Sequence, residues 1–188
     1  MIPKRLLTRE VRLEEVNRDY TEDPNFTHLR YMTRFVGSVG GTQPIVMFVS
    51  TIPDVEESAG GKAGCGKAGR LLIDAIRSID LNMTQVYLTN VVRYRPHEGR
   101  DPRPSEITLS LPYLWREMDI LHPRVVIPIG RFSTSLFFAD QLFAELHGTV
   151  TVEEDYSYVP ITSPHTVLQN PLLRTTLMKD ILAVGQLV

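Results

Sequence analysis

Short apolar runs alternate with longer amphipathic segments along the chain. The apolar run 45–49 lies between Pro44 and Ser50, which is typical of a buried strand in a parallel sheet. Similar runs predict further strands at 86–88, 124–130 and 158–162. We therefore expect four core strands, separated by helices and loops.

Helical spacing of apolar residues fills most of the intervals. A helix is predicted to begin near Lys67, and its apolar face would consist of Leu71, Leu72, Ala75, Ile76 and Ile79. Helices are also predicted over 105–121, over much of 131–146 and over 172–187. Ser105 would be the N-cap of the first of these, and Trp115 would lie in its buried stripe. The alternation predicts an α/β fold, a three-layer α/β/α sandwich with a central, mostly parallel four-stranded sheet.

Length and composition fit one domain. The chain has 188 residues, of which 43% are hydrophobic and 22% are charged, which is ordinary for a globular protein with a full core. We expect a single domain over 1–188. Residues 1–24 are charged and mixed, so we expect a solvated helical or linker extension there, with a short helix at 8–16.

Charge and cysteine content narrow the classes of function. A formal net charge of −2 argues against a generally basic coat for nucleic acid, although basic residues gather in loops considered below. One cysteine excludes an internal disulfide and a thiolate cluster. We find no signal peptide and no apolar run of membrane-spanning length, and we expect a cytoplasmic monomer that does not bind membranes.

The glycine-rich segment 59–64 links the first strand to the helix near Lys67. Backbone of this kind can face a phosphate or an electron-rich ring. Residues 61–68 (GKAGCGKA) approach the nucleotide-binding pattern G-x-x-x-x-G-K-[ST], but Ala68 lacks the hydroxyl that holds magnesium. No aspartate follows the later strands to bind a metal. The sequence therefore argues against a nucleotide triphosphatase, and we expect no metal and no cofactor.

Several segments match known motifs in order along the chain. Residues 50–54 and 61–72 align without a gap with Gly-Glu-Ala-Pro-Gly and the later Gly-x-Pro-Phe-Val-Gly-x-Ala-Gly-x-Leu-Leu, and 89–106, 124–130 and 162–171 match three further motifs. Together these segments resemble family 4 of the uracil-DNA glycosylase superfamily. The resemblance implies DNA as the partner, and hydrolysis of the N-glycosidic bond of a nucleotide flipped out of the helix.

The resemblance also indicates a base pocket. Its residues would be Ser50, Thr51, Ile52, Pro53, Asp54, Gly64, Asn90, Ser163 and His165. Asn90 matters most, because a side-chain amide offers both a donor and an acceptor to the edge of a pyrimidine. The alternative is an Asn that caps the turn after its strand.

The catalytic positions depart from the family pattern. Thr51 stands where the family has glutamate, and Ser163 stands where it has histidine. Asp54 is our candidate for the carboxylate that orients water, with Glu56 and Glu57 as weaker candidates, and His165 is our candidate donor to the leaving base. Asp54 could instead be a plain turn residue, and His165 a surface histidine. No lysine stands at a matched catalytic position, so we expect a monofunctional glycosylase.

Gly64 stands where the family has a phenylalanine that stacks on uracil. Loss of that ring would open the pocket, so we expect a larger base, such as a 5-substituted or glycosylated pyrimidine of hypermodified phage DNA. Such an enzyme would serve in antiviral defence or as a phage-side counterpart. Two alternatives stay open: uracil removal in base excision repair, and a non-catalytic DNA-binding relative.

Contacts to DNA are expected from two groups of residues. The first is basic and consists of Lys62, Lys67 and Arg95. The second, Thr166, Val167 and Leu168, would enter the minor groove, with the two apolar residues as the wedge that replaces the extruded nucleotide. Alternatively, Val167 and Leu168 begin the core face of the last helix.

The family resemblance further implies an iron-sulfur cluster held by four cysteines. No cysteine pair stands near the N-terminus, and the other two ligand positions are Tyr94 and Ser110. We therefore expect no cluster, and the loss of a loop staple rather than of the reaction.

Overall fold

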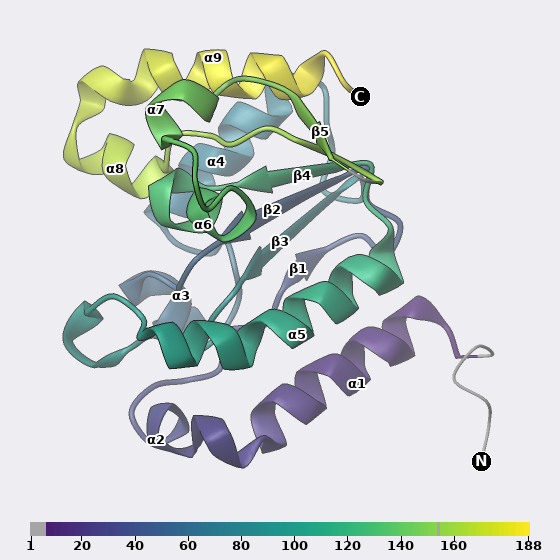
Figure 1. Cartoon of the computed structure of the whole chain (residues 1–188), viewed down its shortest axis with the longest axis vertical. Helices are drawn as coiled ribbons and strands as arrows, with labels where there is room; N and C mark the ends of the chain where they lie inside the picture. Colours follow the sequence, from purple (N-terminus) through teal and green to yellow (C-terminus); the bar gives the residue numbers. More distant parts are fainter. Residues whose placement is uncertain (1–6, 154) are drawn as a thin grey trace.

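The computed structural model describes residues 7–153 and 155–188, and one continuous sheet runs through them (Figure 1). The strands follow the order β1-β3-β2-β4-β6-β5. Their bounds are Val39–Gly40 (β1), Val46–Ser50 (β2), Val86–Asn90 (β3), Val125–Pro128 (β4), Thr151–Glu153 (β5) and Tyr156–Tyr158 (β6). The central strands β3, β2, β4 and β6 are parallel, whereas β1 and β5 pair antiparallel at the edges. The mostly parallel α/β sheet is confirmed, and two short edge strands join the four that were predicted.

Helices cover both faces of this sheet (Figure 1). Their bounds are Arg9–Glu22 (α1), Thr27–Arg30 (α2), Val55–Gly60 (α3), Lys67–Arg77 (α4), Pro104–Leu121 (α5), Gly130–Phe137 (α6), Phe143–Leu146 (α7), Pro164–Gln169 (α8) and Arg174–Gly185 (α9). Short 3₁₀ turns occupy Pro24–Phe26, His97–Gly99 and Pro171–Leu173. No helix of the described chain is both long and apolar enough to cross a membrane.

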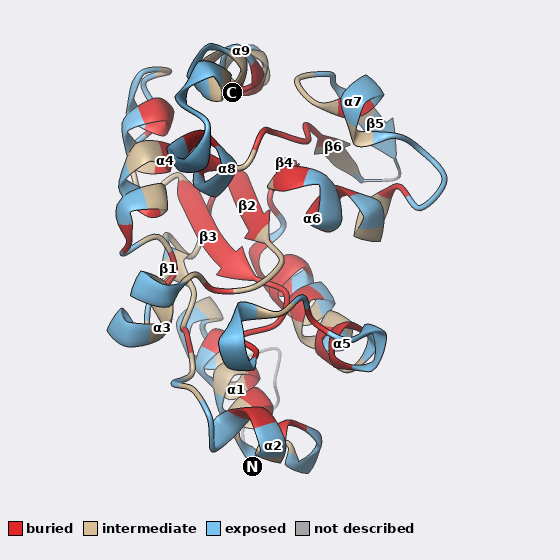
Figure 2. Ribbon diagram, turned by 90° about the vertical axis from the view of Figure 1, so that its left-hand side faces the viewer, coloured by how far each residue is buried: buried red, intermediate tan, exposed pale blue. Residues whose placement is uncertain are grey.

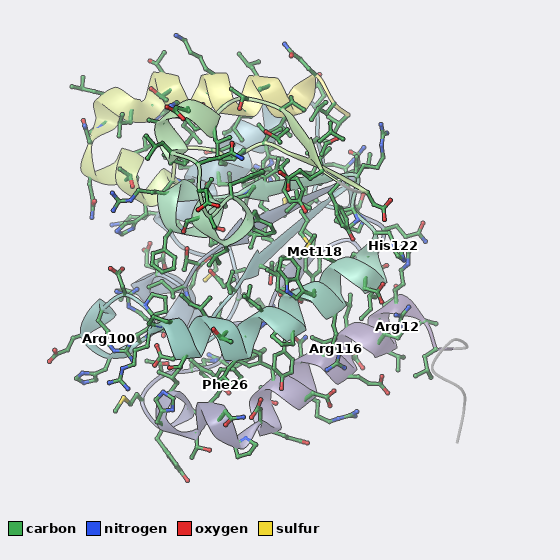
Figure 3. The ribbon with its side chains drawn as sticks, in the orientation of Figure 1. Arg12, Phe26, Arg100, Arg116, Met118 and His122 are labelled. Atoms are coloured by element: carbon green, nitrogen blue, oxygen red, sulfur yellow. The ribbon has the colours of Figure 1, made fainter. Side chains whose placement is uncertain are left out.

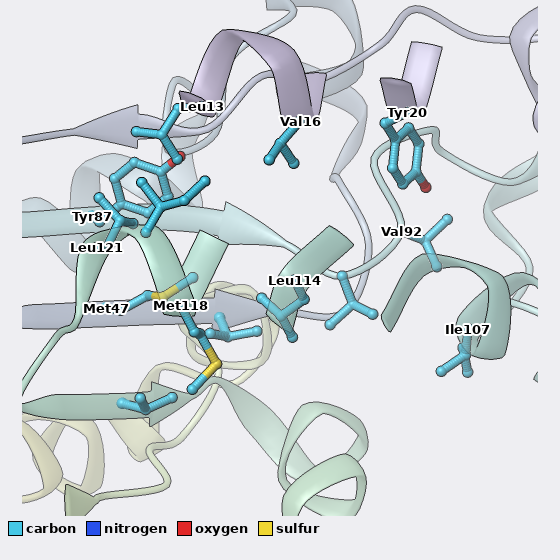
Figure 4. Packing of buried hydrophobic residues seen from close by; sticks show 14 of the residues in the cluster. Leu13, Val16, Tyr20, Met47, Tyr87, Val92, Ile107, Leu114, Met118 and Leu121 are labelled. Atoms are coloured by element: carbon cyan, nitrogen blue, oxygen red, sulfur yellow. The ribbon is translucent and has the colours of Figure 1, made fainter. Parts of the chain in front are cut away.

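Alternate residues of the strands enter two separate cores. Met47 and Val49 of β2 pack into a first core beneath α1 and α5, part of which Figure 4 shows. Val46 and Phe48 point the other way, into a second core beneath α4, α8 and α9. A strand that is buried on both faces has no polar side, which is why the runs in the sequence are continuously apolar.

The N-terminal segment is not a solvated extension. Helix α1 runs to Glu22, beyond the predicted end at residue 16, and it packs along α5. Leu13, Val16 and Tyr20 are buried in the first core. The prediction missed this because the many charges of α1 hide a narrow apolar stripe. The first six residues of the expected extension lie outside the described chain.

A buried ion pair joins α5 to the end of β3. Arg93 Nη2 lies 2.8 Å from Glu117 Oε2, and both side chains are almost completely enclosed. Glu117 also accepts hydrogen bonds from the hydroxyls of Tyr87 and Thr89. The same arginine donates to Asn17 of α1. These contacts fix β3 and the segment that follows it against two helices.

Three local predictions were wrong. Helix α5 has Arg103 rather than Ser105 as its N-cap. The glycine-rich connection after β2 contains a short helix, α3, where a loop was expected. Trp115 is 41% exposed rather than core, and its ring lies edge-on to Phe137 at 5.6 Å between centroids. The stripe of α5 that faces the sheet passes through Leu114 and Met118 instead.

Candidate active site at the carboxyl edge of the sheet

A cavity of about 390 Å³ opens at the carboxyl ends of β2, β3 and β4. This edge faces the viewer in Figure 2, between α8, α6 and the loops after β2 and β3. The cavity is lined by 50–54, Glu57, Gly64, Arg95, 130–132 and 163–165, among others. It brings together segments that are more than a hundred positions apart in the sequence. A crevice at this edge is where ligands bind in open α/β sheets.

The turn 50–54 is held in place by the chain that continues β3. The carbonyls of Ser50 and Thr51 accept hydrogen bonds from the amides of Val91 and Val92. Arg95 Nη1 donates to the carbonyl of Pro53 at 2.8 Å. Arg95 was predicted to contact DNA, and it lines the cavity while tying the two loops together.

Asp54 is the N-cap of α3 and more than a plain turn residue. Its Oδ1 accepts from the amide of Glu57 at 2.7 Å, and Glu57 Oε2 accepts in return from the amide of Asp54 at 3.1 Å. This reciprocal capping box starts the short helix. Asp54 also lines the cavity. Its other oxygen, Oδ2, takes no part in the capping box.

Glu57, a weaker candidate carboxylate in the sequence, also lies at the cavity. One turn of α3 places it on the cavity wall, where its Oε1 accepts from the amide of Gly64 at 2.5 Å. Burial raises the pKa of Glu57, and bonds from Gly64, Asp54 and Asn90 only partly offset this. The sequence signal for this structural role of Glu57 is its position three residues after Asp54, which is the capping-box spacing.

Glu56 has a different partner. Its Oε2 accepts a hydrogen bond from the amide of Lys67, the first residue of α4. It thereby caps that helix, and it is not among the residues that line the cavity. Of the three predicted carboxylates, Asp54 and Glu57 remain beside the cavity.

Asn90 is buried at the end of β3, where it pairs in register with Ser50. It does not line the cavity, but its neighbour Thr89 does. Its side-chain Oδ1 has no hydrogen-bond partner among the described residues. An unpaired buried acceptor of this kind costs about 1–3 kcal/mol of folding stability. The oxygen can accept a hydrogen bond from a donor that reaches it.

Gly64 lines the cavity, but the void expected at this position is largely filled. Its φ is +73°, a left-handed conformation that favours glycine. A Cβ atom at this position would lie 2.7 Å from Leu88 Cδ1. The space beyond Gly64 therefore belongs to Leu88, and the room in the cavity comes from its other walls.

Helix α8 supplies the far wall. Ser163 and His165 both line the cavity, and His165 is exposed, with its Nε2 3.2 Å from the side-chain nitrogen of Gln169. The segment leading into α8 is anchored from behind, because Asp180 accepts from both the amide and the hydroxyl of Thr162 at 2.7 Å.

The predicted wedge is divided between two environments. Val167 is only 3% exposed and packs in the second core, so its assignment to the wedge was wrong. Leu168, the next residue of the helix, points to a different side and is 46% exposed. Thr166 is also exposed. Leu172, at 87% exposure just beyond α8, is an apolar residue that sequence reasoning missed.

The remaining predicted and newly found residues lie around the rim. Lys62, within the glycine-rich segment, and Lys67, the first residue of α4, are exposed and do not line the cavity. Arg131 and Phe132, at the start of α6, do line it. Their only sequence signal was their place directly after a core strand, at the edge where parallel strands end.

The positions that correspond to cluster cysteines do not suit iron. Tyr94 is buried, with its ring 5.9 Å from that of Tyr20 and 5.8 Å from that of Phe35. Ser110 is fully buried and shares a 2.9 Å hydrogen bond with the Tyr20 hydroxyl. Neither side chain offers a thiolate, and packed aromatic rings occupy the surroundings. The chain's cysteine, Cys65, is exposed elsewhere.

Comparison with known proteins adds independent information. A family model described as "Uracil DNA glycosylase superfamily" matches residues 38–184. A type-4 uracil-DNA glycosylase of Sulfurisphaera tokodaii is 34% identical over 170 residues, covering 84% of this chain and 76% of that protein. One from Archaeoglobus fulgidus is 32% identical over 166 residues, covering 82% of each chain. A DNA polymerase of Bacillus phage SP01 is 28% identical over 150 residues, covering 79% of this chain but 16% of that protein.

Proposed function

Because the chain belongs to the uracil-DNA glycosylase superfamily, we propose that it hydrolyses the N-glycosidic bond of a nucleotide flipped out of DNA and leaves an abasic site. The observation that carries this proposal is the shared cavity. The turn 50–54 and Gly64 lie on the two parts of the first family motif and 163–165 on the last motif, and all of them line one space at the carboxyl edge of the sheet.

The proposed chemistry assigns a role to each wall of the cavity. Asp54 would accept a hydrogen bond from the attacking water through its second oxygen and support positive charge on the sugar. His165 would donate to the departing base. Glu57 would hold the backbone of Asp54 and Gly64 in place. Asn90 does not line the cavity, and its unpaired Oδ1 would accept from a base that reaches beyond the cavity wall.

We further propose that the base is larger than uracil, such as a 5-substituted or glycosylated pyrimidine. The cavity volume lies within the range of pockets that hold whole small molecules. The family's glutamate and histidine are replaced by Thr51 and Ser163, so these walls of the cavity differ from the family pattern. The space beside Gly64, in contrast, is taken by Leu88. Similarity to a segment of a phage polymerase is compatible with a role on phage DNA, in defence or on the phage side.

Two other functions remain as alternatives. Uracil removal in base excision repair is favoured by the names of the archaeal relatives. A non-catalytic DNA-binding protein is favoured by the altered catalytic positions. For each of these functions we propose a single-domain monomer in the cytoplasm. For either glycosylase function we propose that no lyase step follows.

An abasic-site assay separates these functions. Duplexes and single strands would carry uracil, 5-hydroxymethyluracil or glucosylated 5-hydroxymethylcytosine, and alkali would convert each abasic site into a strand break. We expect cleavage of a modified base and no break before alkali. Cleavage of uracil alone would favour repair, and DNA binding with no cleavage of any substrate would favour the inert relative.

A further inference from the structure

The following inference rests on the proposed function and concerns how the flipped base is held. Stacking on an aromatic ring is the usual support for an unpaired base. Gly64 has no side chain to provide that ring. A larger residue would not fit there readily, because φ is +73° and a Cβ atom would lie 2.7 Å from Leu88 Cδ1. If the cavity holds a base by stacking, another wall must supply the aromatic side chain.

Besides His165, two residues with aromatic rings occur among the described residues that line the cavity, Phe48 and Phe132. Phe48 is completely buried in the middle of β2 and belongs to the second core. Its ring is committed to packing between the sheet and the helices. Phe132 is 38% exposed and lies in the first turn of α6. His165 also presents an exposed ring to the cavity, but the proposed function assigns it the hydrogen bond to the departing base. Phe132 is therefore the accessible ring that is left for stacking.

Phe132 has no visible structural task. It belongs to neither core and takes part in no ring pair among the described residues, although Phe137 and Phe138 of the same segment do both. An aromatic side chain left open to water at the mouth of a cavity forgoes the stabilisation that burial would give. Its position is better explained by a ligand.

The backbone beneath Phe132 is firmly held. Ser133 Oγ donates to the carbonyl of Val49 at 2.7 Å, which fastens α6 to the end of β2. Thr134 Oγ1 donates to the carbonyl of Gly130 at 2.9 Å, and both hydroxyl residues are buried. A ring carried on such a turn is positioned before the ligand arrives, which lowers the entropy lost on binding.

We propose that Phe132 is the stacking platform for the extruded base, in place of an aromatic residue at position 64. The platform then belongs to α6 rather than to the glycine-rich segment. Stacking uses the π-face that every base shares, so it is insensitive to ring substituents. Phe132 therefore supports turnover of any pyrimidine that enters, and other walls select among them.

The test measures cleavage and base extrusion with one set of variants. Single-turnover cleavage would use the duplex that the wild-type protein cleaves fastest, and extrusion would be followed by the fluorescence of 2-aminopurine next to the target base. Phe132→Ala is expected to slow cleavage about tenfold or more and to weaken the extrusion signal. Phe132→Tyr and Phe132→Trp should stay within about threefold of wild type, and Phe132→Leu should resemble the alanine variant.

Tyr31→Ala is the matched control. Tyr31 is an aromatic residue that is 87% exposed on the segment after α2, and it does not line the cavity. It should leave both signals unchanged, and thermal melting would check that each variant is folded.

Two results would overturn the platform. One is an alanine variant as fast as wild type, and the other is a leucine variant as good as the tyrosine variant, since bulk alone would then suffice. If the wild-type protein cleaves no duplex, the proposed function fails, but the extrusion signal still decides the present inference. A signal that Phe132→Ala abolishes would support the platform, and an unchanged or absent signal would refute it.

Discussion

At the scale of single residues, Asp54 combines a structural task with a proposed catalytic one. Its Oδ1 caps α3, its other oxygen takes no part in the capping box, and the residue lines the cavity. An alanine variant would remove both at once and could not separate them. A better substitution keeps the cap and removes the charge, which asparagine does because it is among the preferred N-cap residues.

We therefore expect Asp54→Asn to melt close to wild type but to lose at least about a hundredfold in single-turnover cleavage. Asp54→Ala should lose similar activity and, in addition, about 1 kcal/mol of unfolding free energy through the lost cap. Both values come from quenched-flow cleavage and urea unfolding on the same preparations. An asparagine variant with activity within threefold of wild type would transfer the catalytic role to Glu57.

At the scale of elements, α8 separates neighbouring residues into a core face and an exposed face, which we propose contacts DNA. Val167 is buried between α4 and α9, whereas Leu168 is exposed. The helix is six residues long, so its orientation depends on this packing and on the anchor between Asp180 and Thr162. Packing and contact with DNA can therefore be tested at adjacent positions.

Val167→Ala should lower the free energy of unfolding by about 1–3 kcal/mol, because it leaves a cavity in the second core. Leu168→Ala should change stability by less than about 0.5 kcal/mol, as exposed substitutions usually do. Only the leucine variant should weaken extrusion of the target base from a duplex, since it removes the wedge. Equal effects of the two variants on stability and on extrusion would contradict this division.

The sequence predicted long elements well and short ones poorly. The continuous apolar runs located the central strands, because both faces of the sheet are buried, and α4 began at the predicted Lys67. Helix α3 escaped detection because its six residues bury no apolar side chain. Val167 was misplaced because sequence order alone does not say which face of a helix meets the core. Phe132 was missed for a different reason, because its proposed role depends on a cavity that forms only when distant segments meet.

At the scale of the whole molecule, hydrogen bonds connect a loop beside the cavity to the helices that cover the sheet. Glu106 of α5 is buried and accepts from Arg100 Nη1 and Nη2 at 2.9 and 2.6 Å and from the amide of Arg103 at 2.7 Å. Figure 3 shows Arg100 in the loop at the start of α5. His28, next to α1 in the fold, lies 3.1 Å from the same carboxylate. One carboxylate thus joins the loop 95–103 to two helices.

This anchor should make stability depend on pH. The bonds from Arg100, more than those from Arg103 and His28, lower the pKa of Glu106 to about 2 from an ordinary 4.5. A carboxyl group whose pKa is lowered by folding stabilises the protein above pH 4.5 and loses that contribution as the pH falls towards 2. Glu106→Gln should therefore unfold about 1–2 kcal/mol more easily at pH 7, and this deficit should shrink near pH 3. Urea unfolding at both pH values measures it, and a deficit that does not change with pH would show that the charge is unimportant.

The two ends of the sheet carry a final consequence. β1 has two residues and β5 has three, so each edge offers few unpaired amides and carbonyls to an incoming strand. Long, flat edges invite molecules to join sheet to sheet into fibrils. Because both edge strands are short, we expect the protein to stay dispersed when it is crowded or overproduced. The particle size measured by light scattering should then stay constant as the protein concentration is raised.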